Sequence, residues 1–529
     1  TLITQRTKDR CLFLTNVMEC VEFNMTEKLI LGPPGCGKTY TLINIVKQEL
    51  QNGTAPERIG FVSFSKKAIE EAKARTTVEL GLSDKDVPWF RTLHSTGFQW
   101  MGMKAEEVVS RYDFRKLGLL LGMAFSNNTA ASLADGILPA AVQEGNKYLE
   151  MIGRATLRML TLEEQYNDAR NYDLSWPMLK KVNEIYTLYK AENNKYDYTD
   201  MIRLFVEQGT SPSLEVLIVD EAQDLTPLQW KQVEILKQTT ERVWYAGDDD
   251  QAIHRWMGVR VEQFMEACDE VEILTQSHRI PSSIHKLANR VVGRIDVRFE
   301  KQWLPTEREG NIDYHSSWYD VNIDHGSWTI MARTNKIIST VAEELRESGY
   351  FFERYGVPSI SPDYMRGINT WNTLVDGVSI SLSDAHALYR IVPKQGENAV
   401  IKRGSAKTLE YVDPEAMLSY EDLVEHHGLI APKDRHANSI VNMSDDDQNY
   451  MSALIKRGED LNKPRIKLST IHAMKGGEDD NIMLFTESAY PCVNSRFPDD
   501  EHRIFYTGIT RTKENLHIIE TGAKYRYEI

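Results

Sequence analysis

Short apolar runs alternate with longer amphipathic stretches in the first part of the chain and again around residue 220. Apolar runs of four to eight residues between turn residues are typical of buried strands, and longer stretches with apolar positions three and four apart are typical of helices. Strands are expected at residues 28–32, 58–64, 215–220 and 242–248, and helices follow the first three at residues 38–51, 65–80 and 227–238. Strands that alternate with helices predict a parallel sheet covered on both faces.

A different pattern lies inside this first sheet region. From about Trp100 to Lys190 the strand signal disappears and helical periods dominate, with helices expected at residues 105–112, 140–160 and 176–192. We therefore expect a helical insertion within the first α/β domain.

A second α/β pattern starts near Val271. It includes an expected strand at residues 329–335, a helix at residues 336–349, and further strand patterns within residues 465–477, 481–487 and 515–520. The mixed, polar segment from about Gly377 to Pro464 predicts a small inserted domain or a mobile loop.

These patterns together predict two α/β domains, each interrupted by an insertion. The chain is thereby divided into six successive segments. The first domain is expected at residues 1–100 and 195–272, interrupted by the helical insertion, and the second is interrupted by the small domain. The remaining expected boundaries are 101–194 for the helical insertion, 273–376 and 465–529 for the second α/β domain, and 377–464 for the small domain.

Composition narrows the class of protein. The chain has 529 residues, of which 41% are hydrophobic and 26% charged, and this length is too great for one hydrophobic core. A formal net charge of -15 argues against a protein that holds nucleic acid by bulk charge, although a local basic channel is compatible with that sum. The acidic balance alone therefore does not decide the partner.

Cysteine usage and hydropathy favour a soluble protein of a reducing cytoplasm. The cysteines are odd in number and none has C-x-x-C spacing, which disfavours a zinc site and a disulfide framework. They are Cys11, Cys20, Cys36, Cys268 and Cys492. The start of the chain does not resemble a signal peptide, and the longest apolar run, near Leu117, is too short to span a membrane.

A glycine-rich loop between the first expected strand and helix matches G-x-x-x-x-G-K-[ST]. Backbone N–H groups of such a loop and the positive end of the helix hold phosphate oxygens, and glycine is needed where side chains would clash with them. The loop and the residue after it are Gly32, Pro33, Pro34, Gly35, Cys36, Gly37, Lys38, Thr39 and Tyr40. We expect Lys38 to neutralise phosphate charge and Thr39 to offer a hydroxyl to Mg²⁺.

An acidic pair follows another expected strand, and it supplies the second half of a nucleotide-hydrolysis site. The apolar run Val216 to Val219 would deliver Asp220 and Glu221 to the carboxyl end of a strand, where open α/β sheets place ligands. Asp220 is suited to Mg²⁺, and Glu221 to Mg²⁺ or to positioning and deprotonating a water molecule. An isolated acidic pair is usually a solvated turn, but the phosphate loop makes the hydrolytic interpretation the stronger one.

Further segments, taken in order, resemble one family. They read "DEAQD" from Asp220, "GDDDQAIHRWMG" from Gly247, "LTQSHR" from Leu274, "STIHAMKGGE" from Ser469 and "YTGITRTKENL" from Tyr506. Their order and approximate spacing resemble those of the UvrD-like superfamily 1 DNA helicases, which include UvrD, Rep and PcrA. The similarity runs from about Leu29 to Leu516, with the two inserted segments matching in position only.

The resemblance implies two RecA-like motor domains of the P-loop NTPase class, with ATP bound between them. In the family's arrangement, Gln251 senses the γ-phosphate and the attacking water, and Arg279 and Arg511 reach the γ-phosphate from the second motor domain. Glu478 would contact the ribose or couple the nucleotide site to DNA. His278 stands where the family commonly has a tyrosine that stacks on adenine, which leaves the choice between ATP and GTP open.

The resemblance also implies a path for single-stranded DNA. Aromatic residues on motif loops would stack on bases without regard to sequence, and small polar or basic residues would lie near the phosphates. The expected stacking residues are Phe64, His94, His254 and Trp256, and the expected phosphate neighbours are Thr92, Arg255, Thr470 and His472. Two positions of the segment from Gly247 depart from the family, because His254 stands where relatives usually have tyrosine and Met257 where a basic residue is common.

The sequence therefore predicts an ATP- and Mg²⁺-dependent DNA helicase that moves 3′ to 5′ along single-stranded DNA and acts at junctions with duplex DNA. Such a chain would serve repair or replication in the cytoplasm of a bacterium or of a phage's host. Two alternatives stay open, a translocase that displaces bound proteins with little unwinding and a nucleotide-gated strand-binding module. RNA as the track also stays open.

Overall fold

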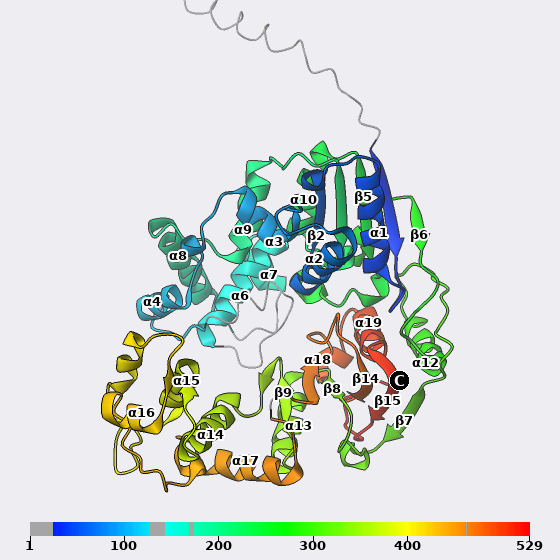
Figure 1. Ribbon diagram of the computed structural model, residues 1–529. Coiled ribbons are helices and arrows are strands. Elements are labelled where there is room, and N and C mark those ends of the chain that lie inside the picture. Colours follow the sequence, from blue (N-terminus) through cyan, green and yellow to red (C-terminus); the bar gives the residue numbers. More distant parts are fainter. Residues whose placement is uncertain (1–24, 127–142, 169–173, 462) are drawn as a thin grey trace, which may run out of the picture. The chain divides into compact units, whose positions relative to one another are not determined.

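The computed structural model describes residues 25–126, 143–168, 174–461 and 463–529, and they form two compact units (Figure 1). The first unit runs to His278 and also takes in Val297–Leu304, and the second consists of Arg279–Asp296 and Pro305–Ile529. Cys11 and Cys20 lie outside the described residues, and the described cysteines, Cys36, Cys268 and Cys492, are not joined in disulfides. Each unit is described below by itself.

The first unit is built on a six-stranded sheet in which neighbouring strands are parallel. Across the sheet, the strands are β3 (Phe90–Thr92), β2 (Ile59–Ser63), β4 (Val216–Asp220), β5 (Arg242–Gly247), β1 (Thr26–Leu31) and β6 (Val271–Ile273). Successive side chains point to opposite faces. Ile218 packs with α1 (Lys38–Gln51) and α2 (Lys66–Leu80), whereas Val219 lies in the core on the other face. The predicted parallel sheet with two covered faces is confirmed.

The short edge strand β6 lies where the second α/β pattern was expected to start. Val271–Ile273 pairs in parallel with β1, and the Leu274 amide continues the pairing by donating to the Leu31 carbonyl over 2.8 Å. The expectation that a second sheet begins near Val271 is therefore wrong. A three-residue strand at a sheet edge has too little periodicity to assign it to one sheet or another.

Helices fill the interval between β3 and β4, as predicted. They are α3 (Leu93–Trp100), α4 (Arg111–Leu121), α6 (Glu144–Leu157), α7 (Leu162–Asp168), α8 (Trp176–Glu192) and α9 (Tyr198–Gln208). The expected helix at residues 105–112 is wrong, because only the short 3₁₀ turn Ala105–Glu107 forms there. Ser110 instead starts α4, since its hydroxyl accepts from the Tyr112 amide while Asp113 accepts from the Ser110 amide.

The second unit contains a seven-stranded sheet that is parallel except at one edge. Across the sheet, the strands are β10 (Val357–Pro358), β9 (Phe352–Arg354), β13 (Ile466–Thr470), β8 (Trp328–Ala332), β14 (Asp479–Phe485), β15 (Thr512–Ile519) and β7 (Asn311–His315), with β10 antiparallel to β9. Its helices include α12 (Ser282–Val292), α13 (Asn335–Glu347), α18 (Tyr490–Val493) and α19 (Pro498–Ile509). The predicted return of an α/β pattern is confirmed in this unit.

A group of helices interrupts the second sheet. It comprises α14 (Pro362–Val375), α15 (Leu382–Ile391), α16 (Tyr420–His426) and α17 (Asp445–Arg457), drawn in yellow-green to orange in Figure 1, with the small hairpin β11 (Ile380–Ser381) and β12 (Met417–Leu418). Trp371 and Leu374 of α14 share a hydrophobic core with Leu388 of α15. The inserted body therefore begins at α14, before the Gly377 boundary expected from the polar composition that follows.

Gly97 of α3 lets two helices of the first unit approach closely. A β-carbon at this position would lie 2.3 Å from the backbone oxygen of Met201 in α9. Because backbone cannot move aside as a side chain can, we expect Gly97→Ala to lower the free energy of unfolding by about 1–3 kcal/mol. Hydrogen exchange of the α3 and α9 amides measures this change.

A matched control is Gly153→Ala in α6. A β-carbon there would meet only the Thr199 hydroxyl, at 3.7 Å, among the described neighbours. Alanine's better helix propensity should then raise stability by up to about 1 kcal/mol. Equal protection in both variants would contradict the close-packing explanation.

Candidate functional site

The loop between β1 and α1 has the backbone expected of a phosphate cradle. Gly35 and Gly37 have φ angles of 75° and 76°, a left-handed region that favours glycine. Gly37 directly precedes α1, and this helix has no side-chain cap at its first turn in the described structure. Helix N–H groups without a cap are suited to bind an anion.

The Lys38 side chain bonds to the backbone of this same loop. Its Nζ donates to the Gly32 carbonyl over 2.9 Å, and a β-carbon at Gly32 would lie 2.0 Å from the lysine Cγ. Glycine at position 32 is therefore needed for the lysine stem to pass. Within the same segment Cys36 is buried, and Thr39 is partly exposed.

Asp220 and Glu221 follow β4 as predicted. Asp220 is 2% exposed, and its backbone neighbour Glu221 donates its amide to Asp220 Oδ1 over 2.9 Å. Burial and the adjacent Glu221 carboxylate raise the pKa of Asp220 to about 7, although the Lys38 charge opposes that rise. A buried carboxylate short of positive charge, together with the Thr39 hydroxyl, forms an oxygen donor set that fits Mg²⁺.

Glu221 has a strained backbone and a fixed side chain. Its φ of 52° is unusual for a residue with a β-carbon. The Gln223 side-chain amide donates to Glu221 Oε2 over 2.6 Å. The carboxylate that is expected to position water is therefore oriented by a neighbour two residues along the chain.

Gln223 also connects Glu221 to the segment that carries Gln251. Its Oε1 accepts from the Asp248 amide over 3.1 Å, and Asp248 Oδ2 in turn accepts from Gln251 Nε2 over 2.6 Å. Gln223 lies within the quoted "DEAQD" segment, but the sequence reasoning assigned it no role. The amide link depends on β4 and β5 being neighbours, which a motif scan does not reveal.

Lys301 is a second residue that the sequence reasoning missed. Its side chain is 0% exposed and forms ion pairs with Asp248, Asp249 and Asp250. It comes about fifty positions after these aspartates in a segment without helix or strand, so no local pattern indicates it.

The segment from Ser277 to His278 lies against the phosphate loop. Ser277 Oγ donates to the Pro34 carbonyl over 2.7 Å, and the His278 amide donates to the Gly35 carbonyl over 2.9 Å. The His278 ring is exposed, and so is Tyr40. His278 therefore belongs to the first unit and not, as the expected boundary at residue 273 implied, to the second.

Three other predicted residues gather in the second unit. Arg279 Nη1 forms an ion pair with Glu478 Oε2 at 2.8 Å, and this contact, with Lys513 and Arg511 nearby, lowers the pKa of Glu478 against the effect of burial. Arg511 is buried and donates through Nε to the Thr507 carbonyl over 3.0 Å. The structure thus brings Arg279, Glu478 and Arg511 together within one unit.

Two of the residues expected to stack on bases are buried against each other. Phe64 and His254 are 4% and 3% exposed, and their rings pack against each other with centroids 5.4 Å apart. Rings buried to this extent present no face for base stacking in this structure, and their place on the strand path stays a prediction. Loop motifs do not reveal such burial, because it depends on which neighbouring side chains cover the ring.

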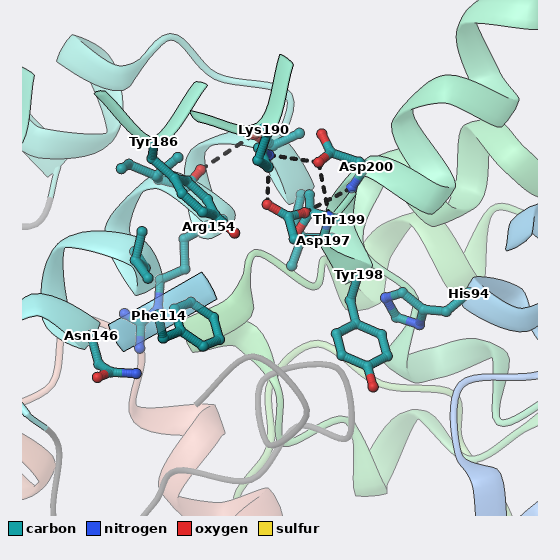
Figure 2. Close-up of a pocket in the computed structure, with 15 residues that line it drawn as sticks. His94, Phe114, Asn146, Arg154, Tyr186, Lys190, Asp197, Tyr198, Thr199 and Asp200 are labelled. Atoms are coloured by element: carbon teal, nitrogen blue, oxygen red, sulfur yellow. Dashed lines mark hydrogen bonds and ion pairs between the residues drawn. The ribbon is translucent and has the colours of Figure 1, made fainter. Parts of the chain in front are cut away.

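His94 is also buried rather than exposed. It lines a pocket, where its ring meets Tyr198 edge-on with centroids 6.2 Å apart (Figure 2). Lys190, which pairs with Asp197 and Asp200 at 2.6 Å each, lines the same pocket. Burial lowers the pKa of His94 to about 4, so the ring is neutral at physiological pH.

Trp256 and Arg255 remain partly exposed. The Trp256 ring meets His254 edge-on at 6.3 Å, and the Arg154 guanidinium lies over it at 4.8 Å. Arg255 contacts Glu262 at 3.5 Å. Met257, by contrast, is part of the hydrophobic core. Arg154 was not predicted, since it comes from the helical insertion.

The other expected phosphate neighbours have local structural roles. Thr92 caps α3 by accepting from the Ser95 amide over 3.2 Å, and Thr470 ends β13 and accepts from the Ala473 amide over 3.3 Å. His472 is partly exposed beyond β13. Thr92 belongs to the first unit, and Thr470 and His472 belong to the second.

Two models of known families match this chain, one in each of the two units. The UvrD/REP helicase N-terminal domain model matches residues 15–272, and the UvrD-like helicase C-terminal domain model matches residues 435–522. The chain belongs to the UvrD/Rep helicase family. The predicted fold class, two RecA-like motor domains with parallel sheets and insertions, is confirmed.

Several curated relatives of this UvrD/Rep-family chain come from bacteria. "ATP-dependent DNA helicase PcrA" of Leuconostoc citreum is 25% identical over 63% of this chain and 45% of its own length. The protein of the same name from Bacillus subtilis is 22% identical over 94% of this chain and 81% of its own length. "ATP-dependent DNA helicase Rep" of Escherichia coli is 24% identical over 54% of this chain and 44% of its own length. Two of these three matches thus span less than half of the relative.

A search of the described helices for membrane spans is negative. None of them combines the length and the apolar character that crossing a bilayer requires.

The raised pKa of Asp220 predicts a pH-dependent cost of keeping this carboxyl buried. Its pKa of about 7 in the folded chain exceeds the ordinary value of 3.8, so the folded chain retains a proton that the unfolded chain releases between these values. The contribution of Asp220 to the free energy of unfolding therefore falls as pH rises from about 4 to about 7. Asp220→Asn should be more stable than the native chain at pH 8, by at most about 4 kcal/mol, and the difference should shrink at pH 5.

Thermal unfolding at pH 5 and pH 8 measures this difference. Asp248→Asn is the matched control of opposite sign, because ion pairing with Lys301 lowers the pKa of Asp248. That variant should lose stability at pH 8. A stability gain in Asp220→Asn of the same size at both pH values would contradict the raised pKa.

Proposed function

We propose that this chain is an ATP-driven motor that moves 3′ to 5′ along single-stranded DNA and separates duplex DNA at junctions. One observation carries the hydrolytic part of the proposal. The phosphate loop, the Asp220–Glu221 pair and the Gln251 segment follow β1, β4 and β5, which are adjacent parallel strands. Their carboxyl ends therefore meet at one edge of the sheet, where α/β folds bind ligands.

Each residue of this edge has a proposed task. The loop amides and Lys38 bind the phosphates of ATP, and Glu221 accepts a proton from the attacking water while Gln251 orients that water. Thr39 and Asp220, with Glu221 close by, would hold Mg²⁺, which supplies charge neutralisation at the phosphate oxygens. The exposed His278 ring is proposed to stack on adenine.

The arginine pair of the second unit has a proposed role in turnover. Arg279 and Arg511 stabilise charge that develops on the γ-phosphate, and such arginines typically contribute about 10³–10⁵-fold to rate. Glu478, which pairs with Arg279, is proposed to hold this arginine until nucleotide binds. Hydrolysis is thereby coupled to the second motor domain.

The residues proposed to bind DNA are those of the predicted path that are partly exposed. Trp256 offers a partly exposed indole for base stacking, and Arg255 offers charge to a phosphate. Thr92, Thr470 and His472 stay predicted phosphate neighbours. Phe64, His94 and His254 are buried, and their proposed role is to support the exposed residues of the path. They could stack on bases themselves only if strand binding exposed their rings.

One observation favours the alternative of a translocase with little unwinding. The alignment with the Bacillus subtilis PcrA spans 616 positions, more than the 529 residues of this chain, so that relative has segments without a counterpart here. Strand displacement on 3′-tailed, 5′-tailed and RNA-containing duplexes distinguishes the two activities and fixes polarity and track. The setting proposed for either activity is DNA repair or replication in the cytoplasm of a bacterium or a phage's host.

Substitution of Lys38 tests the site itself. Lys38→Ala removes the ammonium that neutralises phosphate charge, so DNA-stimulated ATP hydrolysis should fall by at least about 100-fold. Single-strand binding should stay within about threefold, because the expected DNA contacts lie on other loops. ATP turnover and fluorescence anisotropy with a labelled oligonucleotide measure the two effects.

The control for this test is Lys66→Ala, which removes an exposed lysine from the first turn of α2. Turnover that survives in Lys38→Ala would refute the proposed site. A native chain that binds DNA and ATP without hydrolysis would instead support the nucleotide-gated binding module.

A further inference from the structure

Lys301 occupies the centre of a buried group of charges in the first unit. Its Nζ lies 3.2 Å from Asp248 Oδ1 and 2.8 Å from Asp250 Oδ2, and it is also paired with Asp249. All three carboxylates are at most 1% exposed. The lysine ammonium therefore stands where a metal ion would otherwise balance three successive aspartates.

The segment around Lys301 makes further contacts with Asp249 and Asp250. Arg298 binds Asp250 in a two-point arrangement, with Nε to Oδ1 at 2.8 Å and Nη2 to Oδ2 at 2.7 Å, and the Phe299 amide donates to Asp249 Oδ2 over 2.8 Å. Asp248 has no such second cation from this segment among the described contacts. Lys301 is thus the cation of this segment that pairs with Asp248.

The balance of charges in this group determines whether Asp248 is ionised. Three carboxylates face two cations in the group, and the pKa of Asp249 is raised to about 6 by burial and by its acidic neighbours. The pKa of Asp248 is lowered nevertheless, with Lys301 the largest favourable cause and Lys38 the next. Lys301 therefore keeps Asp248 ionised in a buried place.

Asp248 is the hydrogen-bond acceptor that fixes Gln251. Its Oδ2 accepts from Gln251 Nε2 over 2.6 Å, while its other oxygen faces Lys301. Protonation of Asp248 would weaken this bond, because a charged acceptor forms the stronger hydrogen bond. The Asp248 amide also bonds to Gln223, which holds Glu221.

We propose that Lys301 is a positioning residue for hydrolysis, which orients Gln251 by holding Asp248 ionised. The inference rests on the proposed function and adds to it a residue outside the motifs. The Lys301 segment is anchored beside the phosphate loop as well, since the Ser277 amide donates to the Leu304 carbonyl over 2.9 Å and Ser277 Oγ bonds to Pro34. The segment Val297–Leu304 therefore stabilises the edge of the first sheet where the proposed hydrolytic residues lie.

The test compares Lys301→Met with Arg298→Met. Both remove a cation that pairs with Asp250, but only the first removes the partner of Asp248. We expect Lys301→Met to lower kcat for DNA-stimulated ATP hydrolysis between about tenfold and a hundredfold, with KM for ATP changed by less than about twofold. Arg298→Met should lower kcat by at most about threefold. Melting temperatures of both variants report the shared loss of stability.

The pH profile separates positioning from stability. Without Lys301, the cations described near Asp248, Asp249 and Asp250 are Arg298 and the more distant Lys38, so the carboxylates should take up protons at higher pH. Activity of Lys301→Met should therefore fall steeply from pH 8 to pH 6, whereas Arg298→Met should follow the native profile. Equal kcat losses and parallel profiles in the two variants would overturn the proposal.

Failure of the proposed function would have a different signature. A native chain without ATP hydrolysis would refute that function, and the inference would then be judged from the side-chain amide resonance of Gln251, assigned with Gln251→Ala. This resonance should shift in Lys301→Met and keep its position in Arg298→Met. An unchanged resonance in Lys301→Met would overturn the positioning role.

A separate observation concerns the second unit, where two histidines and an aspartate meet on neighbouring strands. Asp313 of β7 is the register partner of His517 of β15, and His315 follows Asp313 by two positions on the same face. His315 Nε2 lies 3.1 Å from His517 Nδ1, which lies 3.9 Å from Asp313 Oδ2. One donor atom from each residue lies within 4.8 Å of the others.

The surroundings of this cluster support metal binding. Asn311 Nδ2 donates to Asp313 Oδ2 over 2.6 Å and orients the carboxylate, and the Trp328 ring packs against His517 at 5.2 Å. Outer contacts of this kind fix the orientation of metal ligands. In contrast to the Asp248 group, the described contacts place no lysine or arginine among these three side chains.

We infer that Asp313, His315 and His517 form a site for a divalent transition metal such as Zn²⁺, with water as a fourth ligand. Two imidazole nitrogens and one carboxylate oxygen are a donor set that suits this ion. The strands fix the three side chains in one register, so the site needs no change of fold to form.

Calorimetric titration of the chelator-treated full chain with Zn²⁺ tests the site. His517→Ala should weaken one binding event by at least about tenfold, and Asp313→Asn should weaken the same event less. His386→Ala, which removes a partly exposed histidine of α15, should leave that event unchanged. Identical isotherms for the native chain and His517→Ala would overturn the inference.

Discussion

Buried carboxylates at the ends of neighbouring strands must be balanced by positive charge, and this requirement organises the first unit. Asp248 follows β5 and has Lys301 as a permanent partner, which lowers its pKa. Asp220 ends β4 and forms no ion pair among the described contacts, and burial with the adjacent Glu221 carboxylate raises its pKa to about 7. The same sheet edge therefore holds one carboxylate whose charge is already compensated and another that is prepared for a cation from outside.

This contrast assigns different roles to residues of the same type. A carboxylate with a resident ammonium is a fixed acceptor, suited to orient a side chain such as Gln251. A carboxylate without one is suited to take a metal ion together with nucleotide, because the ion relieves the cost of burying its charge. The two aspartates could not exchange these roles without moving Lys301.

Elements with a strong local pattern were predictable from the sequence. The helix expected at residues 38–51 has the bounds of α1, and the helix expected at residues 176–192 has those of α8, because each combines helical spacing with a clear start. The phosphate loop and the Asp220–Glu221 pair were predictable for a related reason, since their chemistry needs residues that are close in sequence.

Features that depend on distant residues were not predictable in this way. Phe64 and His254 lie on motif loops, yet each ring is covered by the other and by the surrounding core. Lys301 and Asp248 are brought together only when the chain returns to the first unit at Val297. The start of the inserted body at α14 likewise follows from a shared core and not from the composition change near Gly377.

The position of Lys38 shows how the loop can be rigid and still receive a ligand. Its ammonium donates to the Gly32 carbonyl, and its charge also acts on the Asp220 and Asp248 carboxylates. A single hydrogen bond to a charged group contributes only about 1.5–3 kcal/mol, and phosphate oxygens accept stronger, charge-assisted bonds. The lysine can therefore leave this carbonyl for a phosphate at a net gain in free energy. The glycine at position 32 serves both states, because it supplies the carbonyl and leaves room for the lysine stem.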